Sequence, residues 1–185
     1  MPAPYNNVRS KLARAVCAYL QSQNCGSFAD VVPYEFDRNV LYPITIIRPA
    51  KGTPEVPLTG MLRVMVLVTI MGSATHGEGE PNPDLARVNF DSRVAQTFDA
   101  LMQTSDGQTL RATAQAITDA GRALATAVDA SAAGVQLAAN NADMADFTCF
   151  DVYDAGFENT DPDSEGCSWC ETLVFEMVCC GSAVN

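Results

Sequence analysis

The sequence predicts a single α+β domain spanning residues 1–185, in which helices pack on a mainly antiparallel sheet. An amphipathic helical pattern opens the chain, two long β-type runs lie at residues 58–71 and 166–180, and helical periodicity fills much of the segment between them. No internal repeat or linker divides the chain. A domain of this length buries roughly 70% of the surface that its unfolded form exposes, so a sizeable core is expected.

The first helix is expected over residues 5–23, where apolar side chains recur at helical spacing. These apolar residues are Val8, Leu12, Val16, Tyr19 and Leu20. The basic residues between them are expected on the side that faces solvent: Arg9, Lys11 and Arg14. Asn24 or Gly26 is expected to end the helix, because both residue types suit the left-handed conformation common at that position.

Two short β-type runs follow, at residues 29–36 and 42–48. The prolines within them, Pro33, Pro43 and Pro49, place these runs at the edges or ends of a sheet. Residues 51–57 contain a glycine and two prolines and are expected to form a loop. The long run at residues 58–71 is largely apolar on both faces, so this strand is expected to be central or covered twice.

A second helix is expected to begin at Asn82, which suits an N-cap, with Pro83 at the first helical position. Its apolar stripe consists of Leu85, Val88, Val94, Phe98, Leu101 and Met102. A helical insertion at about residues 105–140 carries a narrower stripe of Leu110, Ala114, Ile117, Gly121, Leu124 and Val128. Such a stripe suits close packing on another helix, within the subunit or in a neighbour. Residues 130–145 are expected to be irregular or partly helical.

The chain is expected to close with two strands, at residues 146–153 and 166–180, joined by an acidic loop at 157–166. One face of the closing strand is apolar and consists of Trp169, Leu173, Phe175, Met177 and Cys179. The other face holds Ser168, Thr172 and Glu176. The expected order is thus helix, three or four strands, two helices and two strands.

Charge is unevenly distributed along the chain. Eleven Lys and Arg face 22 Asp and Glu, giving a net charge of -11, and no basic residue lies beyond Arg122. Residues 143–176 contain ten acidic side chains and no cation, so a strongly negative C-terminal surface is expected. This charge distribution argues against a protein that grips nucleic acid, because such proteins need a basic face. The charge favours either simple solubility or a surface that DNA slides past without sticking.

The seven cysteines are expected to be free thiols packed as small hydrophobes, in a protein kept in a reducing cytoplasm. Alternatively, Cys167, Cys170, Cys179 and Cys180 could form a four-thiolate zinc site, which would make the protein a zinc-stabilised adaptor or regulatory module. An extended segment points the members of each close pair to opposite faces, which weighs against zinc. A thioredoxin-like redox pair normally lies at a helix N-terminus, whereas Cys167 and Cys170 lead into a strand amid acidic residues, which weighs against redox activity.

No catalytic, cofactor-binding or metal-binding residue is assigned, and the protein is not expected to be an enzyme. His76 is the only histidine and lies in a glycine-containing loop, a poor place to hold the base of a cysteine hydrolase. That loop lacks the lysine and spacing of a phosphate loop. Residues 159–165 lack the frame of a calcium loop. No apolar run of about 18 residues predicts a membrane span.

Taken together, the chain resembles the tail terminator and related tail-completion and neck proteins of long-tailed bacteriophages. The resemblance spans nearly the whole chain. It is carried by the N-terminal helix, the segments Leu41-Tyr-Pro-Ile-Thr-Ile-Ile47 and Pro57-Leu-Thr-Gly60 before a long strand, the helix at 86–103, the segment Asp146-Phe-Thr-Cys-Phe150 and the closing strand at 169–179. This chain adds a helix at 110–128 and a loop at 154–166 to that pattern.

The resemblance implies a small tail-terminator-like α/β sandwich that forms a ring, usually a hexamer, on the tail tube. It implies the tail tube protein and the head connector or neck proteins as partners, DNA passing through the lumen without specific binding, and no membrane. It places the protein in the virion tail or neck, assembled in the host cytoplasm. A head-completion or connector protein is the nearest alternative. The expected acidic lumen or loop surface is Asp154, Glu158, Asp161, Asp163 and Glu165, and the expected subunit packing residues are Leu110, Ala114, Ile117 and Leu124.

Overall fold

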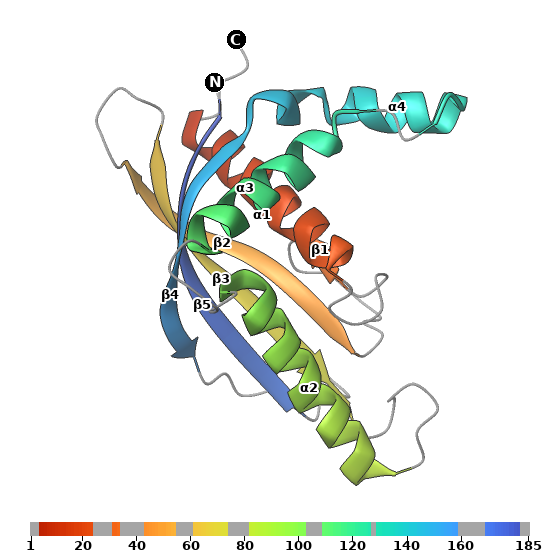
Figure 1. Cartoon of the computed structure of the whole chain (residues 1–185), viewed down its shortest axis with the longest axis vertical. Helices are drawn as coiled ribbons and strands as arrows, with labels where there is room; N and C mark the ends of the chain where they lie inside the picture. The colour runs from red at the N-terminus through yellow and green to blue at the C-terminus, as the bar shows by residue number, and fades with distance from the viewer. Residues whose placement is uncertain are drawn as a thin grey trace.

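The structure is a computed structural model of the 185-residue chain, and it describes residues 4–23, 31–33, 43–54, 61–73, 82–102, 109–126, 129–158 and 169–181. Its elements confirm the α+β class (Figure 1). In order they are α1 (Pro4–Ser22), β1 (Val31–Pro33), β2 (Ile44–Pro54), β3 (Leu62–Gly72), α2 (Pro83–Met102), α3 (Thr109–Ala123), α4 (Ala132–Asn140), the short 3₁₀ helix η2 (Ala142–Asp146), β4 (Thr148–Glu158) and β5 (Trp169–Cys180).

The strands form one sheet in the order β1-β2-β3-β5-β4. Only β1 and β2 are parallel, so the sheet is mainly antiparallel, as the sequence predicts. Strands β3 and β5 pair without interruption from Leu62 opposite Cys179 to Gly72 opposite Trp169. This register places the apolar faces of the two long strands on the same side of the sheet. The expected central position of β3 is therefore confirmed.

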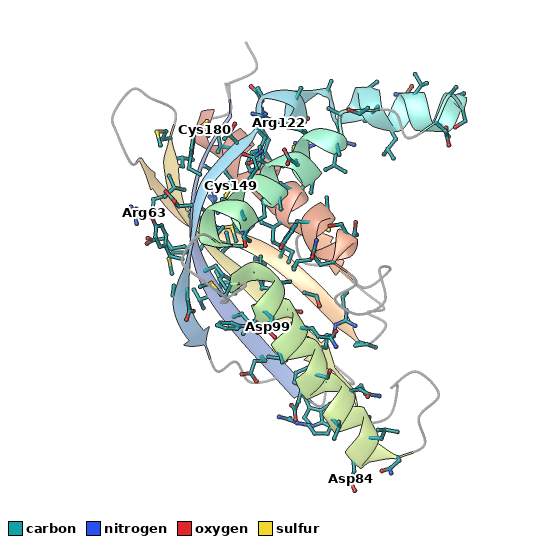
Figure 2. The ribbon with its side chains drawn as sticks, viewed as in Figure 1. Arg63, Asp84, Asp99, Arg122, Cys149 and Cys180 are labelled. Carbon is teal, nitrogen blue, oxygen red and sulfur yellow. The ribbon has the colours of Figure 1, made fainter. Side chains whose placement is uncertain are left out.

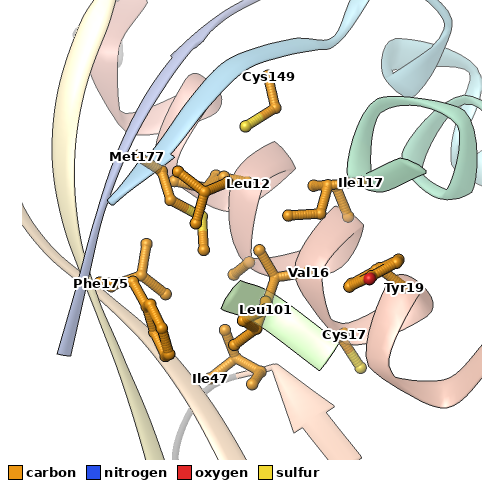
Figure 3. Close-up of a cluster of buried hydrophobic side chains, with 14 of the residues drawn as sticks. Leu12, Val16, Cys17, Tyr19, Ile47, Leu101, Ile117, Cys149, Phe175 and Met177 are labelled. Atoms are coloured by element: carbon orange, nitrogen blue, oxygen red, sulfur yellow. The ribbon is translucent and has the colours of Figure 1, made fainter. Parts of the chain in front are cut away.

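Helices α1, α2 and α3 lie on one side of the sheet (Figure 1). The inner faces of β3 and β5 meet them with side chains that are fully buried: Val64, Val66, Val68, Leu173, Phe175 and Met177. Helix α1 contributes Leu12 and Val16 to the centre of this core, beside Ile117 of α3 (Figure 3). Each such side chain gains about 1.5–3 kcal/mol from burial, so the two-layer packing dominates the stability.

The outer face of the sheet is mixed. Thr69 and Thr172 lie opposite each other on β3 and β5, and their hydroxyl oxygens are 3.0 Å apart and buried. Farther along the same pair of strands, Arg63 forms an ion pair with Glu176 and lies over the ring of Tyr153. Met65 and Leu67 are only half-buried, so β3 is central in the sheet but is not equally covered on its two faces.

Strand β2 is longer than the sequence predicts. The loop expected at residues 51–57 is wrong for residues 51–54, which continue the pairing with β3 beyond an irregularity between Pro49 and Gly52. A bulge at this point lets the strand continue although proline cannot donate a ladder hydrogen bond. The parallel partner β1 pairs only as far as Ile47, so Pro49 lies where the described part of the sheet has an edge on that side.

Helix α2 begins as the sequence predicts, since the side-chain oxygen of Asn82 accepts a hydrogen bond from the backbone N–H of Asp84 at 3.0 Å. Its buried face differs from the predicted stripe. Phe90 packs against Trp169, and Arg93 donates a hydrogen bond to Thr45. Phe90 and Arg93 lie on a different side of the helix from Leu85 and Val88, so the two pairs cannot both face the sheet. Leu85 and Val88 are consequently 43% and 60% exposed.

Burial raises the pKa of two core thiols, to about 11 for Cys17 and to about 12 for Cys149. At neutral pH these cysteines are packed as protonated thiols, which agrees with the expectation of small hydrophobic side chains. Each thiol has a higher pKa in the folded chain than in the unfolded chain, where it is near 9. Its contribution to the free energy of unfolding is therefore fully present below pH 9 and is lost as the pH rises toward the pKa of the folded state.

We expect the free energy of unfolding to fall between pH 9 and 11 by about 1.4 kcal/mol per pH unit for each such thiol, because the unfolded chain releases a proton that the folded chain keeps. Urea denaturation of Cys149→Ala under reducing conditions should show a shallower alkaline slope than the unsubstituted protein. An unchanged slope would contradict the burial of this thiol.

Candidate assembly surfaces

The α3 stripe proves to be an intramolecular contact. Ala114 and Ile117, which were expected to pack against a neighbouring subunit, are 1% and 0% exposed within this subunit. Leu124 also packs partly against the core, and nothing is described of the Leu110 side chain. Helix α3 crosses α1 so closely that a Cβ on Gly121 would lie 2.8 Å from the Cβ of Ala15. This corrects the subunit-packing assignment of Ala114 and Ile117 in favour of the within-subunit alternative, and that of Leu110 stays a prediction.

The expected acidic surface is described only in part. Asp154 is exposed on β4, where its carboxylate accepts a hydrogen bond from the backbone N–H of Gly156 at 2.9 Å. Gly156 has a φ of 104°, which favours glycine at this irregular point of the edge strand. Glu158 is the last residue of β4. The remaining predicted members, Asp161, Asp163 and Glu165, lie outside the described residues.

Basic residues of the N-terminal half neutralise three C-terminal acids. Lys11 Nζ lies 2.7 Å from Asp146 Oδ1, Arg14 Nη2 lies 2.5 Å from Asp143 Oδ2, and Arg63 pairs with Glu176. The absence of cations from residues 143–176 therefore does not translate into ten free negative charges. The expectation that Lys11 faces solvent is wrong, because its side chain is fully buried.

Two of these ion pairs connect α1 to η2, the 3₁₀ helix that follows the C-terminal end of α4. Arg14 Nη1 also donates to Asn141 Oδ1 at 3.0 Å, and Asn141 donates from its amide to the carbonyl of Leu137 at 3.0 Å. Met144 of η2 is buried in the core below this network. The Arg14 guanidinium and the Asp143 carboxylate meet through two parallel hydrogen bonds, which fix the orientation of η2 relative to α1.

Helix α4 projects from the body of the protein at the upper end of Figure 1. It has nine residues, and none of them is buried. Its two largest apolar side chains, Val135 and Leu137, are 52% and 57% exposed. They point to different sides of the helix. Most of the other positions are alanine, but Gln136 and Asn140 form a polar side, where Gln136 Nε2 donates a hydrogen bond to Asn140 Oδ1 at 2.9 Å.

The start of α4 is nevertheless carefully capped. Ser131 Oγ accepts the N–H of Gly134 at 3.0 Å, and Asp129 Oδ1 accepts the N–H of Ser131 at 2.9 Å. Hydrogen bonds from the Ser131 side chain and from its backbone N–H lower the pKa of Asp129. A Cβ on Gly134 would lie only 2.5 Å from Asp129 Oδ1, so the glycine makes this turn possible. The cap is the signal by which the sequence could have revealed α4, within a segment expected to be only irregular or partly helical.

Strand β4 forms one edge of the described sheet and presents Phe150 and Tyr153, each 40% exposed. Its pairing with β5 is irregular between Cys149 and Asp151 and again between Asp154 and Gly156. Irregular pairing and acidic side chains both discourage the addition of a further strand. This edge is therefore a poor template for sheet extension.

The four-thiolate zinc site does not form. Cys170 lies at one end of β5, and Cys179 and Cys180 lie at the other, nine and ten residues along an extended strand, which is roughly 30 Å. Cys179 also points to the opposite face of the sheet from Cys180. Within the described ranges, no group of three metal-ligating side chains comes together. Cys167 and His76 are not among the described residues.

A scan against protein-family models and a search of curated proteins give no match to this chain. Among the helices that the structure describes, none has the length and apolar character needed to cross a membrane.

The buried ion pair below α4 should respond asymmetrically to substitution. Asp146→Ala leaves a fully buried ammonium without this carboxylate and should cost about 3–5 kcal/mol. Lys11→Met should cost less, because the Asp146 side chain is 38% exposed and water can solvate it. Chemical denaturation of both variants measures the difference, and equal losses would contradict this account of the pair.

Proposed function

We propose that this protein is a structural subunit of a long-tailed bacteriophage virion, a tail terminator or neck protein that assembles as a ring at the end of the tail tube. The ring would be hexameric, as the resemblance implies, and would join the tube to the head connector while DNA passes through its lumen. The proposal assigns no chemical reaction to the chain.

Helix α4 is the observation that carries this proposal. A short isolated helix is marginal in water, and most helices in proteins owe their stability to the burial of an apolar face. This helix is capped at its start and clamped at its end, yet buries none of its own residues. Such a construction is typical of an element whose partner is another molecule. A subunit whose task is assembly supplies that partner.

The sheet and the charge distribution agree with the same role. The two-layer α+β architecture suits the terminator-like sandwich that the resemblance implies. The cations Lys11, Arg14 and Arg63 are engaged with carboxylates, so they do not form a basic groove for phosphates. A net charge of -11 lets DNA pass without being held. The strand geometry disfavours the alternative of a zinc-stabilised module.

Electron microscopy of the recombinant protein tests the proposal. We expect closed rings with a central hole, and we expect the protein in purified virions at the junction of head and tail. Ring formation with location in the capsid shell would contradict the tail assignment. A protein that stays monomeric at high concentration and is absent from purified virions would falsify the proposal as a whole.

The same preparation should not retain duplex DNA, even at low salt where phosphate contacts are strongest. A filter-binding measurement over a salt series provides the readout. Binding that weakens steeply with salt would reveal a basic surface and contradict a lumen that DNA passes freely.

A further inference from the structure

We propose that Cys149 and Cys179 form a disulfide bond between β4 and β5 when the protein leaves reducing conditions. Both are free thiols in the structure, and they lie directly opposite each other in the pairing of the two strands. The bond lies within one subunit, so this modification goes beyond the proposed ring and does not depend on it.

The register of the sheet distinguishes this pair from the other cysteines. Of the five cysteines that the structure describes, Cys17 lies on α1, and Cys170 and Cys180 each lie opposite a residue of another type. Cys149 and Cys179 lie opposite one another, and both belong to the buried core on the inner side of the sheet. Figure 3 shows the Cys149 sulfur directed into this core. The two thiols therefore occupy the same side of the β4–β5 ladder.

The backbone of Cys149 shows which kind of strand pair it forms. Its N–H donates to the Thr118 hydroxyl of α3 at 2.9 Å, and its carbonyl accepts a hydrogen bond from the same hydroxyl at 3.2 Å. The N–H and C=O of a strand residue point to the same side of the strand, so both groups of Cys149 point away from β5. Cys149 and Cys179 are therefore a non-hydrogen-bonded pair.

This kind of pair has the spacing that a disulfide needs. Its Cα atoms are typically about 4.5 Å apart, and disulfides span Cα separations of about 4.4–6.8 Å. Helix α3 also holds this end of β4, because Arg122 donates hydrogen bonds to the Phe147 carbonyl at 2.9 Å and to the Thr148 hydroxyl at 2.8 Å (Figure 2). The two cysteines are thus aligned by contacts that do not involve their sulfur atoms.

The reduced thiols lose little when the bond forms. The Cys149 sulfur lies 3.7 Å from the carbonyl oxygen of Asp151, and a thiol is a weak hydrogen-bond donor. Burial raises the pKa of Cys179 well above its usual value, and the neighbouring Cys149 and Cys180 raise it further. The effect of Cys149 on this pKa agrees with the closeness of the two sulfurs. A disulfide removes both ionisable groups from the core.

The oxidant is a low-molecular-weight disulfide such as oxidised glutathione. One cysteine thiolate attacks this disulfide, forms a mixed disulfide and releases one glutathione thiolate, which takes up a proton. The second cysteine then attacks the mixed disulfide, which forms the bond between Cys149 and Cys179 and releases the second glutathione. Two protein thiols are oxidised, and one glutathione disulfide is reduced to two thiols.

Access limits the rate of this reaction in the folded chain. Both thiols are buried, and their raised pKa leaves little thiolate at neutral pH. Strand β4 is at an edge of the described sheet, and its pairing with β5 is irregular directly after Cys149. The bond therefore forms while β4 pairs with β5 during folding, or when this edge opens locally.

Peptide mapping after refolding tests the proposal. Reduced protein is unfolded in urea, refolded in a mixture of reduced and oxidised glutathione, blocked with N-ethylmaleimide, and digested with trypsin and glutamyl endopeptidase. No basic residue follows Arg122, and the next glutamate is Glu158, so Cys149 is released in peptide 123–158. Glu176 is the last glutamate, so peptide 177–185 carries Cys179. Mass spectrometry should find these two peptides linked.

Two variants assign the link, because peptide 177–185 also contains Cys180. Cys179→Ser should abolish it. Cys180→Ser is the matched control one residue along the same strand, and it should keep the link. A link that survives in Cys179→Ser, or no link in the unsubstituted protein, would overturn the proposal and would leave the proposed ring untouched.

Thermal unfolding of the linked and the reduced protein gives a readout that needs no variant. The bond closes a loop of about 30 residues and should raise the midpoint of unfolding by roughly 5–15 °C. Dithiothreitol should reverse the rise. A midpoint that falls when the link forms would show that the two strands are forced together, and would contradict the alignment inferred from Thr118.

Discussion

The pairing of β3 with β5 is the interaction on which the rest of the structure depends. These strands are adjacent in the centre of the sheet but are separated by the whole segment from residue 73 to residue 168. Together they form a platform. Strands β2 and β4 pair with its two sides, and α1 and α2 lie against its inner face. Closing so long an excursion is tolerable because the entropic cost grows only slowly with length, by about 0.6 kcal/mol per doubling.

The sequence predicts this platform well, because the closing strand alternates with a period of two and the run at residues 58–71 is long, apolar and rich in β-branched residues. It also predicts the start of α2, because a local hydrogen bond from Asn82 needs no tertiary information. It fails where burial depends on a distant partner. Nothing local shows that Lys11 is buried beside Asp146, or that Arg93 takes an inward position beside Thr45.

The assembly surfaces divide in the same way. The α3 stripe has the right spacing for helix packing, but spacing alone does not say whether the partner is α1 or another subunit; the close approach of Gly121 to Ala15 decides for α1. Helix α4 has the opposite character. Its alanine-rich sequence gives a weak helical signal, and only the folded chain shows that none of its nine residues is buried by the part of the protein that the structure describes. The surface on which the proposed assembly depends is thus the part of the fold that sequence patterns reveal least.

Ion pairs connect α1, near the start of the chain, to acidic residues of the C-terminal part. Lys11 and Arg14 bind Asp146 and Asp143 of η2, so α1, which packs in the core, also fixes the direction of α4. A mutation in the middle of α1 can therefore alter a surface on the far side of the 3₁₀ helix without touching it. The two ion pairs between α1 and η2 therefore link the stability of the core to the orientation of α4.

Helices α2, α3 and α4 all lie in the segment that connects the two central strands, β3 and β5. The pairing of these two strands does not depend on the length or sequence of α4. A lineage could lengthen, shorten or replace the projecting helix while keeping the same platform, provided that η2 still offers its two carboxylates to α1. Replacing the projecting helix α4 while keeping η2 would therefore change one exposed surface of the protein and leave the packing of the sheet against α1, α2 and α3 in place.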